Sequence, residues 1–246
     1  MMQLLQLLNI VLVMLSVFNQ GDCMRDNIIG GHVAKPHSHP YMVLIPYESQ
    51  GNIWRECDGF LVREDFVMTA AHCKGMRMFV FPGVHDKSKL DKNLRVEATP
   101  FVHPNYTLNE NEVKNDIMLL KLKQNVTLTN KVGLLALPEK KNAIPTTDCL
   151  VSGWGSTVFN HPKNSDLLRE VNVTVNTSLN CDTPATICTR GSIGPFQGDS
   201  GGPLVCGEVA CGVVSACKFD GETYTHYYTR IAHFRHWIDK MMNTIH

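Results

Sequence analysis

Short apolar runs separated by turn residues make up most of the chain after residue 27. Runs of this kind are typical of strands in an all-β sandwich or barrel. We therefore predict an all-β fold. The apolar runs lie at residues 40–45, 59–73, 77–81, 116–122, 149–155, 168–175, 201–206, 210–217 and 225–231.

Only the carboxyl end has the spacing of a helix. Apolar residues recur there at intervals of three and four, which predicts an amphipathic helix. They are Ile231, Phe234, Trp237, Ile238, Met241 and Met242. No internal repeat is visible, and a break between two similar halves is expected within residues 130–143.

Length and composition narrow the class of protein. A chain of 246 residues with 43% hydrophobic and 19% charged residues can bury a large core, which excludes a disordered tail, a collagen-like rod and a small disulfide knot. Lys plus Arg (23) equals Asp plus Glu (23). The basic surface needed to bind nucleic acid or acidic membranes is therefore missing, and we expect neither partner.

The amino terminus has the pattern of a secretion signal. Residues 4–18 are apolar except for Gln6, Asn9 and Ser16, a run too short for a comfortable membrane span but suited to a signal peptide. We predict a signal peptide at residues 1–21, cut after Gly21, with an uncleaved anchor as the alternative.

Secretion changes how the nine cysteines are interpreted. In an oxidising compartment disulfides are the default, and the chain has no CxxC pair of the kind that binds metal. Four N-x-[ST] sequons also fit a secreted glycoprotein. The predicted glycosylation sites are Asn105, Asn125, Asn172 and Asn176.

Three motifs carry candidate chemistry. Ser200 stands among glycines in GDSGGP, where a substrate carbonyl could approach backbone amides closely. His72 precedes a cysteine in TAAHC, and Asp116 begins the apolar run DIMLLKL. Together they supply a nucleophile, a base and a group that orients the base.

The blocks IIGG, TAAHC, NDIMLLKL, SGWG and GDSGGP follow one another in this order between residue 28 and the predicted helix. In this the chain resembles the chymotrypsin-type serine peptidases, and HVAKPHSHPYM is similar to the granzyme and mast-cell protease subgroup. The resemblance implies two six-stranded antiparallel β-barrels, at about 28–135 and 136–246, with a C-terminal helix and the active site between the barrels.

The resemblance also implies roles. Ser200 would attack the scissile carbonyl, His72 would accept its proton, Asp116 would orient the imidazole, and the amides of Gly198 and Ser200 would form the oxyanion hole. The chain would be a secreted or granule-stored serine endopeptidase that works through an acyl-enzyme and needs no cofactor. Metal is not expected either, because neither His37 with His39 nor His233 with His236 has further ligands nearby.

Activation would follow removal of a pro-segment, residues 22–27. In this family the new amino group pairs with the aspartate before the nucleophile, here Ile28 with Asp199. Asn27 departs from the basic residue that a trypsin-like activator needs. Two routes would give the same terminus, a cut after Arg25 with removal of one dipeptide or removal of three successive dipeptides.

The resemblance implies three disulfides, and Cys23 would leave with the pro-segment. Cys211 and Cys217 are six residues apart in one apparent strand, roughly 20 Å at about 3.3 Å per residue. They should therefore not pair with each other unless the strand breaks. The implied pairs are Cys57 with Cys73, Cys149 with Cys206, and Cys181 with Cys188.

The specificity pocket would lack a carboxylate, because Gly194 stands at its base, which disfavours trypsin-like specificity. A cysteine thiol at 217 would narrow the entrance, and His226 would intrude from below. Two outcomes follow, a shallow pocket for small or medium apolar P1 side chains, which we favour, or an acidic P1 preference if His226 is protonated. The pocket residues would be Gly194, Pro195, Phe196, Gln197, Ser215, Ala216, Cys217 and His226.

One competing hypothesis is a catalytically weak or inactive binding or antimicrobial protein on the same scaffold. For the enzyme we expect protein and peptide substrates, protein protease inhibitors and a monomeric state. Removal of residues 1–27 takes away one arginine and two aspartates and leaves a formal charge of +1. Binding to anionic proteoglycan is therefore open but not indicated.

Overall fold

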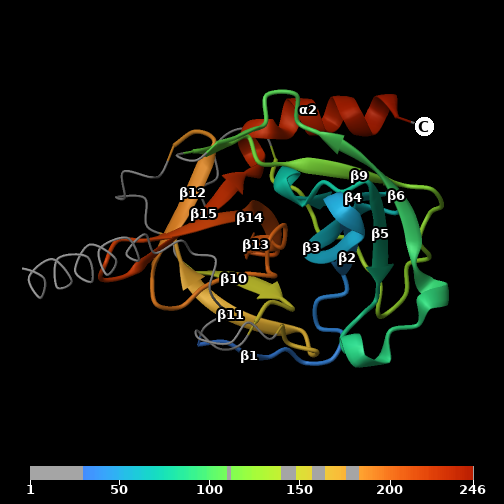
Figure 1. The fold of residues 1–246 in the computed structure, drawn as a ribbon, viewed down its shortest axis with the longest axis horizontal. Helices are drawn as coiled ribbons and strands as arrows, with labels where there is room; N and C mark the ends of the chain where they lie inside the picture. The colour runs from blue at the N-terminus through green and yellow to red at the C-terminus, as the bar shows by residue number, and fades with distance from the viewer. Residues whose placement is uncertain (1–29, 110–111, 140–147, 157–163, 176–182, 246) are drawn as a thin grey trace, which may run out of the picture.

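The computed structural model describes residues 30–109, 112–139, 148–156, 164–175 and 183–245 (Figure 1). The predicted signal peptide and pro-segment lie outside these residues, as does Asn176. The described chain is almost entirely β-structure with one α-helix at its carboxyl end. None of its helices is both long and apolar enough for a membrane span.

The first half closes into a six-stranded antiparallel barrel, with the strands in the order β2-β3-β4-β9-β6-β5. Its inward-facing side chains are apolar, as the sequence pattern predicts, and they form a continuous core. Four short 3-10 turns, η1 (Gln50–Asn52), η2 (Ala71–Cys73), η3 (Lys87–Lys89) and η4 (Lys92–Leu94), connect the strands. The strands are β2 (Met42–Ser49), β3 (Ile53–Arg63), β4 (Phe66–Thr69), β5 (Arg77–Pro82), β6 (Val96–Val102) and β9 (Met118–Leu122).

The second half is a seven-stranded antiparallel sheet in the order β1-β11-β10-β13-β14-β15-β12. A bridge between Val175 and Thr189 joins the end of β11 to β12, so that the six later strands curl toward closure. The strands are β1 (His32–Val33), β10 (Asp148–Gly153), β11 (Arg169–Thr174), β12 (Thr186–Gly191), β13 (Pro203–Cys206), β14 (Val209–Phe219) and β15 (Tyr224–Arg230). A separate hairpin pairs β7 (Thr107–Leu108) with β8 (Val113–Lys114).

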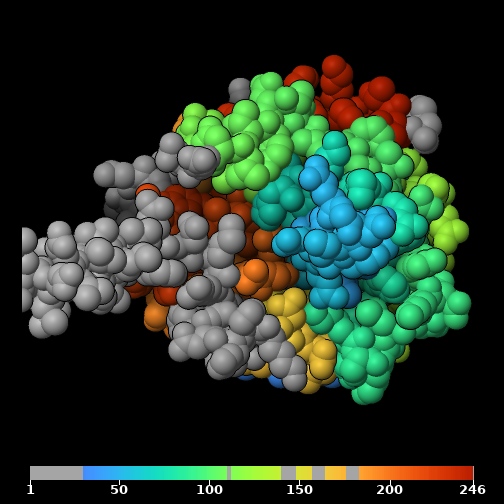
Figure 2. All heavy atoms as spheres, in the orientation of Figure 1, coloured from blue at the N-terminus to red at the C-terminus, as the bar shows by residue number. Residues whose placement is uncertain are grey.

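Each end of the described chain crosses to the opposite half. β1 pairs with β11 of the second sheet, where His32 faces Glu170. Helix α2 (Ile231–Thr244) instead buries Ile231, Phe234 and Ile238 in the same core cluster as the first barrel. Figure 2 shows the two halves side by side, with the helix lying along the first. These crossings hold the halves in a fixed relation.

A third core cluster lies at the junction of the halves. Met42 and Leu44 from β2 meet Trp154, which follows β10, and all three are almost fully buried. Trp154 also donates a hydrogen bond from Nε1 to the carbonyl oxygen of His85 at 3.2 Å. The segment after β10 is thereby anchored to the first barrel, close to the candidate site. The predicted fold class is confirmed, with β1 as an addition to the second sheet.

Candidate active site

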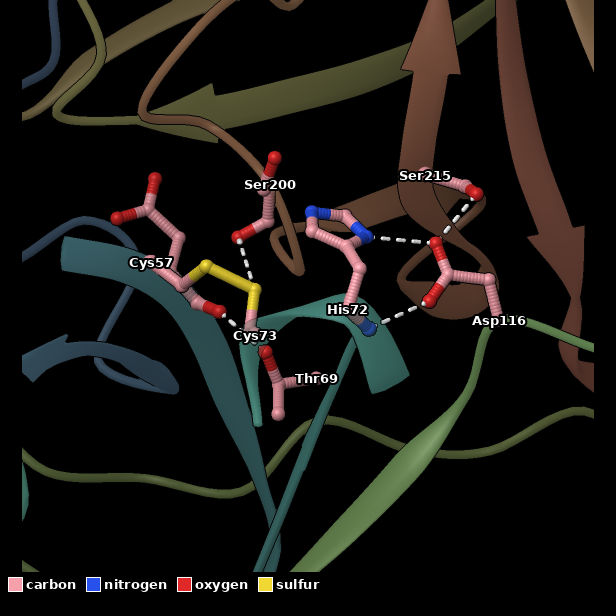
Figure 3. The surroundings of a disulfide bond; sticks show 8 residues. Cys57, Thr69, His72, Cys73, Asp116, Ser200 and Ser215 are labelled. Carbon is pink, nitrogen blue, oxygen red and sulfur yellow. Dashed lines mark hydrogen bonds and ion pairs between the residues drawn. A yellow bond between two sulfur atoms is a disulfide. The ribbon is translucent and has the colours of Figure 1, made fainter. Parts of the chain in front are cut away.

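Residues from both halves meet where the nucleophile motif approaches the first barrel. His72 lies in η2 directly after β4, Asp116 lies just before β9, and Ser200 lies in the loop before β13. The imidazole of His72 lies between the Asp116 carboxyl and Ser200 (Figure 3). Asp116 is buried, whereas the His72 side chain is 25% exposed, so that its free edge remains accessible.

The Asp116 carboxylate fixes the orientation of His72 through two hydrogen bonds. The His72 amide donates to Oδ1 at 2.9 Å, and Nδ1 lies 2.7 Å from Oδ2. Since a carboxylate only accepts, Nδ1 carries the proton in the neutral ring, and Nε2 is left as the acceptor facing Ser200. Ser215 donates to Oδ2 at 2.6 Å, and Thr229 donates to the Asp116 carbonyl oxygen at 2.8 Å.

These contacts change the protonation of both groups. Burial disfavours the charged form of His72, but the charge and hydrogen bond of Asp116 outweigh it and raise the histidine pKa above its usual 6.5. Burial also opposes ionisation of Asp116, yet His72 and the hydrogen bonds lower the aspartate pKa. The pair therefore favours an ionised aspartate beside an imidazole that gains a proton readily.

Ser200 is anchored through its backbone. Its carbonyl oxygen accepts a hydrogen bond from the Asp58 amide at 2.8 Å and lies 3.9 Å from Cys73 Sγ. The described residues contain no hydrogen bond between Ser200 Oγ and His72 Nε2. A nucleophile and its base are often further apart without substrate than during the reaction, so the serine hydroxyl must turn toward the ring for proton transfer.

The nucleophile loop depends on glycine. Gly201 has a positive φ of 84°, and a β-carbon there would lie 2.1 Å from Thr69 Oγ1. Only glycine therefore lets this loop pack against the first barrel. Gly198 also has a positive φ, and neither its amide nor that of Ser200 donates a hydrogen bond within the described part of the chain.

Asp199 is fully buried behind this loop. Its carboxyl oxygens accept hydrogen bonds from the amides of Gly155, at 2.8 Å, and Phe196, at 2.9 Å. Burial raises the pKa of Asp199 to about 7 in spite of these donors. The partner implied by the resemblance, Ile28, lies outside the described residues.

His226 lies beside Gly194, the residue predicted at the base of the pocket. A β-carbon on Gly194 would lie only 2.6 Å from His226 Nε2. The histidine is fully buried, and its ring is 5.5 Å from that of Phe196. Burial lowers the pKa of His226 to about 4. On the wall, Ser215, Ala216 and Cys217 are half-buried, and Gln197 is exposed.

Two disulfides join Cys57 to Cys73 and Cys149 to Cys206, the pairs that the resemblance implies. Cys188 is also disulfide-bonded, but Cys181 lies outside the described residues. Cys211 is free and buried, so the expectation that it does not pair with Cys217 is confirmed.

Cys217 is itself disulfide-bonded, and the expectation of a thiol at the pocket entrance is therefore wrong. Distance along one strand excludes a pair with Cys211 but says nothing about residues that approach from elsewhere. Among the described residues, Cys57, His72 and Cys73 form the one close group of potential metal ligands. Their two sulfurs are bonded to each other and are not available to an ion.

Sequence reasoning missed three residues around the site. Ser215 was placed only in the pocket wall, yet its hydroxyl holds Asp116, and Thr229 supports the same residue from β15. Asp58 lies between the charged pair Arg55 and Glu56 and the apolar run that begins at Gly59, so no local signal in the sequence marked it as a buried residue.

Comparison with known proteins establishes the class. Residues 28–238 match the trypsin family, and the chain belongs to it. It is a serine endopeptidase, and the predicted resemblance is confirmed.

Individual relatives narrow the group. Granzyme-like protein 1 of Rattus norvegicus is 38% identical over 247 residues, which cover 96% of this chain and 99% of that protein. Duodenase-1 of Bos taurus is 42% identical over 228 residues, covering 87% and 89% respectively. A solved structure of granzyme C, described as "Structure of GrC", has a TM-score of 0.78 at 37% identity and covers 88% of this chain and 100% of that one.

Proposed function

We propose that Ser200, His72 and Asp116 cut peptide bonds through an acyl-enzyme intermediate. The observation that carries this proposal is the double hydrogen bond from His72 to Asp116, which leaves Nε2 unprotonated on the side of Ser200. Such a ring can accept the serine proton and return it to a leaving group. A buried aspartate with only a structural role would not need to orient an accessible imidazole.

The reaction would run in two halves. Ser200 Oγ attacks the substrate carbonyl carbon while His72 Nε2 accepts its proton, and Asp116 stabilises the imidazolium that forms. The amides of Gly198 and Ser200 would hold the oxyanion. The C–N bond then breaks as His72 gives the proton to the amine, and water, activated by the same histidine, releases the acyl group.

The precursor would be activated by cleavage before Ile28. The family match begins at residue 28, which supports this position. The new ammonium group would pair with Asp199. This carboxyl group is buried, and its ionised form is costly near neutral pH without a cation beside it. Pairing would order the loop that carries Gly198 and Ser200. Both processing routes after the predicted signal peptide give this terminus.

We propose a preference for small or medium apolar side chains at P1. His226 occupies the space beside Gly194, which leaves little depth for a long side chain. Its pKa of about 4 keeps the ring neutral at physiological pH, so it supplies no charge for an acidic side chain. The acidic P1 preference is thus the weaker of the two alternatives.

Secretion or granule storage remains part of the proposal. Asn105, Asn125 and Asn172 have exposed side chains, which supports glycan attachment at these sequons. We further propose protein protease inhibitors as partners and a monomeric state. The formal charge of +1 after processing gives anionic proteoglycan no strong attraction.

A cleavage profile on a peptide library tests the activity and its specificity together. Protein beginning at Ile28 should cut after small or medium apolar residues, and Ser200→Ala should lower turnover by on the order of 10⁶-fold. His226→Gly should extend the profile to larger side chains, because it removes the ring beside Gly194. A profile dominated by Lys and Arg would contradict the pocket.

A binding protein on the same scaffold is the second candidate. The observation in its favour is that Ser200 and His72 share no hydrogen bond within the described structure. Such a protein would keep the fold and the His72–Asp116 pair but would not form a covalent intermediate.

A further inference from the structure

A second buried carboxyl group lies behind the nucleophile loop. Asp58, in β3, is fully buried although it carries a carboxyl group. Its amide donates to the Ser200 carbonyl oxygen at 2.8 Å, and its own carbonyl oxygen accepts from Thr69 Oγ1 at 2.7 Å. Asp58 is therefore a direct link between the first barrel and the nucleophile.

The Asp58 side chain shares its surroundings with Asp199. Consecutive amides hold the two groups, since Trp154 donates to Asp58 Oδ2 at 3.1 Å and Gly155 donates to Asp199 Oδ1 at 2.8 Å. A β-carbon on Gly153 would lie 2.4 Å from the first of these oxygens and 2.2 Å from the second. The other oxygen of Asp58, Oδ1, is buried and has no hydrogen-bond partner among the described residues.

Two buried carboxyl groups this close do not both ionise readily. Burial, followed by the charge of Asp199, raises the pKa of Asp58 well above its usual value. Lys87 and Glu56 also act on Asp58, but they form an ion pair with each other at 2.8 Å, so their effects oppose one another. Tyr228, whose pKa is raised by burial and by Asp199, stays neutral. The pair therefore retains a proton near neutral pH.

We propose that Asp58 is a positioning residue that acts through Asp199, so that a new amino terminus must displace a proton from the Asp58–Asp199 pair to order the nucleophile loop. This inference rests on the proposed activation before Ile28. An ammonium group beside Asp199 favours the ionised carboxylate, and the displaced proton passes to solvent. Because the coupling is reciprocal, acid opposes insertion of the terminus.

With Asp58 present, acid opposes insertion of the new amino terminus more strongly than it would with Asp199 alone. Without a second carboxyl group, Asp199 would ionise at a lower pH, and the terminus would stay inserted in more acidic solution. Asp58→Asn keeps the size of the side chain and an oxygen that can accept from Trp154, but it cannot ionise. It therefore isolates the charge of Asp58 from its packing.

The test compares processed and unprocessed protein by thermal unfolding. Both carry Ser200→Ala to prevent self-cleavage, and the melting temperature is measured between about pH 5 and pH 8. Processed protein should be the more stable at pH 8, and its advantage should shrink on acidification. With Asp58→Asn, the pH at which this stability advantage is lost should fall by about one unit or more. The exposed Asp148→Asn in β10 is the matched control, and it should leave that pH unchanged.

The outcomes separate this inference from the activation on which it rests. If processing adds no stability at any pH, the proposed activation is wrong. If processing adds stability with the same pH dependence in Asp58→Asn and in the parent, the role of Asp58 is overturned and the activation stands. Should the asparagine variant not fold, Asp58→Ala answers the same question, because it also removes the ionisable group. Titration of His72 is common to all the proteins compared and cancels in the difference.

Discussion

At the scale of single residues, the activity depends on which protonation state each buried group prefers. The carboxylate of Asp116 holds His72 by two hydrogen bonds and raises its pKa, whereas burial lowers the pKa of His226 to about 4. One histidine is thereby prepared to accept a proton near neutral pH, and the other stays neutral. The residue type is the same, and the surroundings decide its role.

This difference predicts how activity depends on pH. His72 must be neutral to accept the Ser200 proton, so kcat/KM should fall as pH drops through a histidine pKa above 6.5. Asp116→Asn removes the charge that raises this pKa. We expect it to lower kcat by about 10⁴-fold and to move the acid limb to lower pH. The rate of peptide hydrolysis across pH measures both effects.

Ser215→Ala is the matched control for that substitution. It removes one hydrogen bond to Asp116 and leaves its charge in place, so the loss should be much smaller than with Asp116→Asn. An acid limb that stays at the same pH after Asp116→Asn would show that the carboxylate does not tune His72.

Sequence alone could point to His72, Asp116 and Ser200 as candidate catalytic residues, because each lies in a recognisable motif. It could not show the Asp58–Asp199 pair, since the two residues belong to different halves and meet only through the tertiary fold. The same reason hides the role of Ser215, whose hydroxyl points to a residue almost a hundred positions earlier in the chain. Motifs in the sequence can indicate the chemistry of a site, but contacts between residues of the two halves can be found only from the three-dimensional structure.

At the scale of elements, the helix and the small strands show what periodicity can detect. The spacing of Ile231, Phe234 and Ile238 predicted α2, and these side chains are the buried ones in it. Strand β1 has only two residues, both exposed, and thus no apolar pattern. Its position depends on pairing with β11, which a local pattern does not encode.

The helix contributes to stability through the face that it buries against the first barrel. Phe234 is 4% exposed and packs in that core. Phe234→Ala should lower the free energy of unfolding by about 3–5 kcal/mol, through lost burial and a new cavity. Urea denaturation measures this change in the free energy of unfolding. The substitution His236→Ala, at an exposed position of the same helix, is the control. Equal effects of the two substitutions would mean that the helix does not support the barrel.

At the scale of the whole molecule, the two halves form the site only together. The first barrel supplies His72 and Asp116, the second supplies Ser200 and Ser215, and Asp58 and Trp154 tie them at the junction. The crossed ends, β1 on the second sheet and α2 on the first barrel, keep this junction fixed. The family resemblance implied two barrels, whereas the crossing of the ends came only from the structure.

The most direct test of the account is covalent labelling of the processed protein by a fluorophosphonate. The account predicts that intact-mass and peptide analysis find one adduct, located on Ser200, and that Ser200→Ala and His72→Ala abolish it. Correctly processed, folded protein that takes up no label would contradict the account and favour a binding protein on the same scaffold.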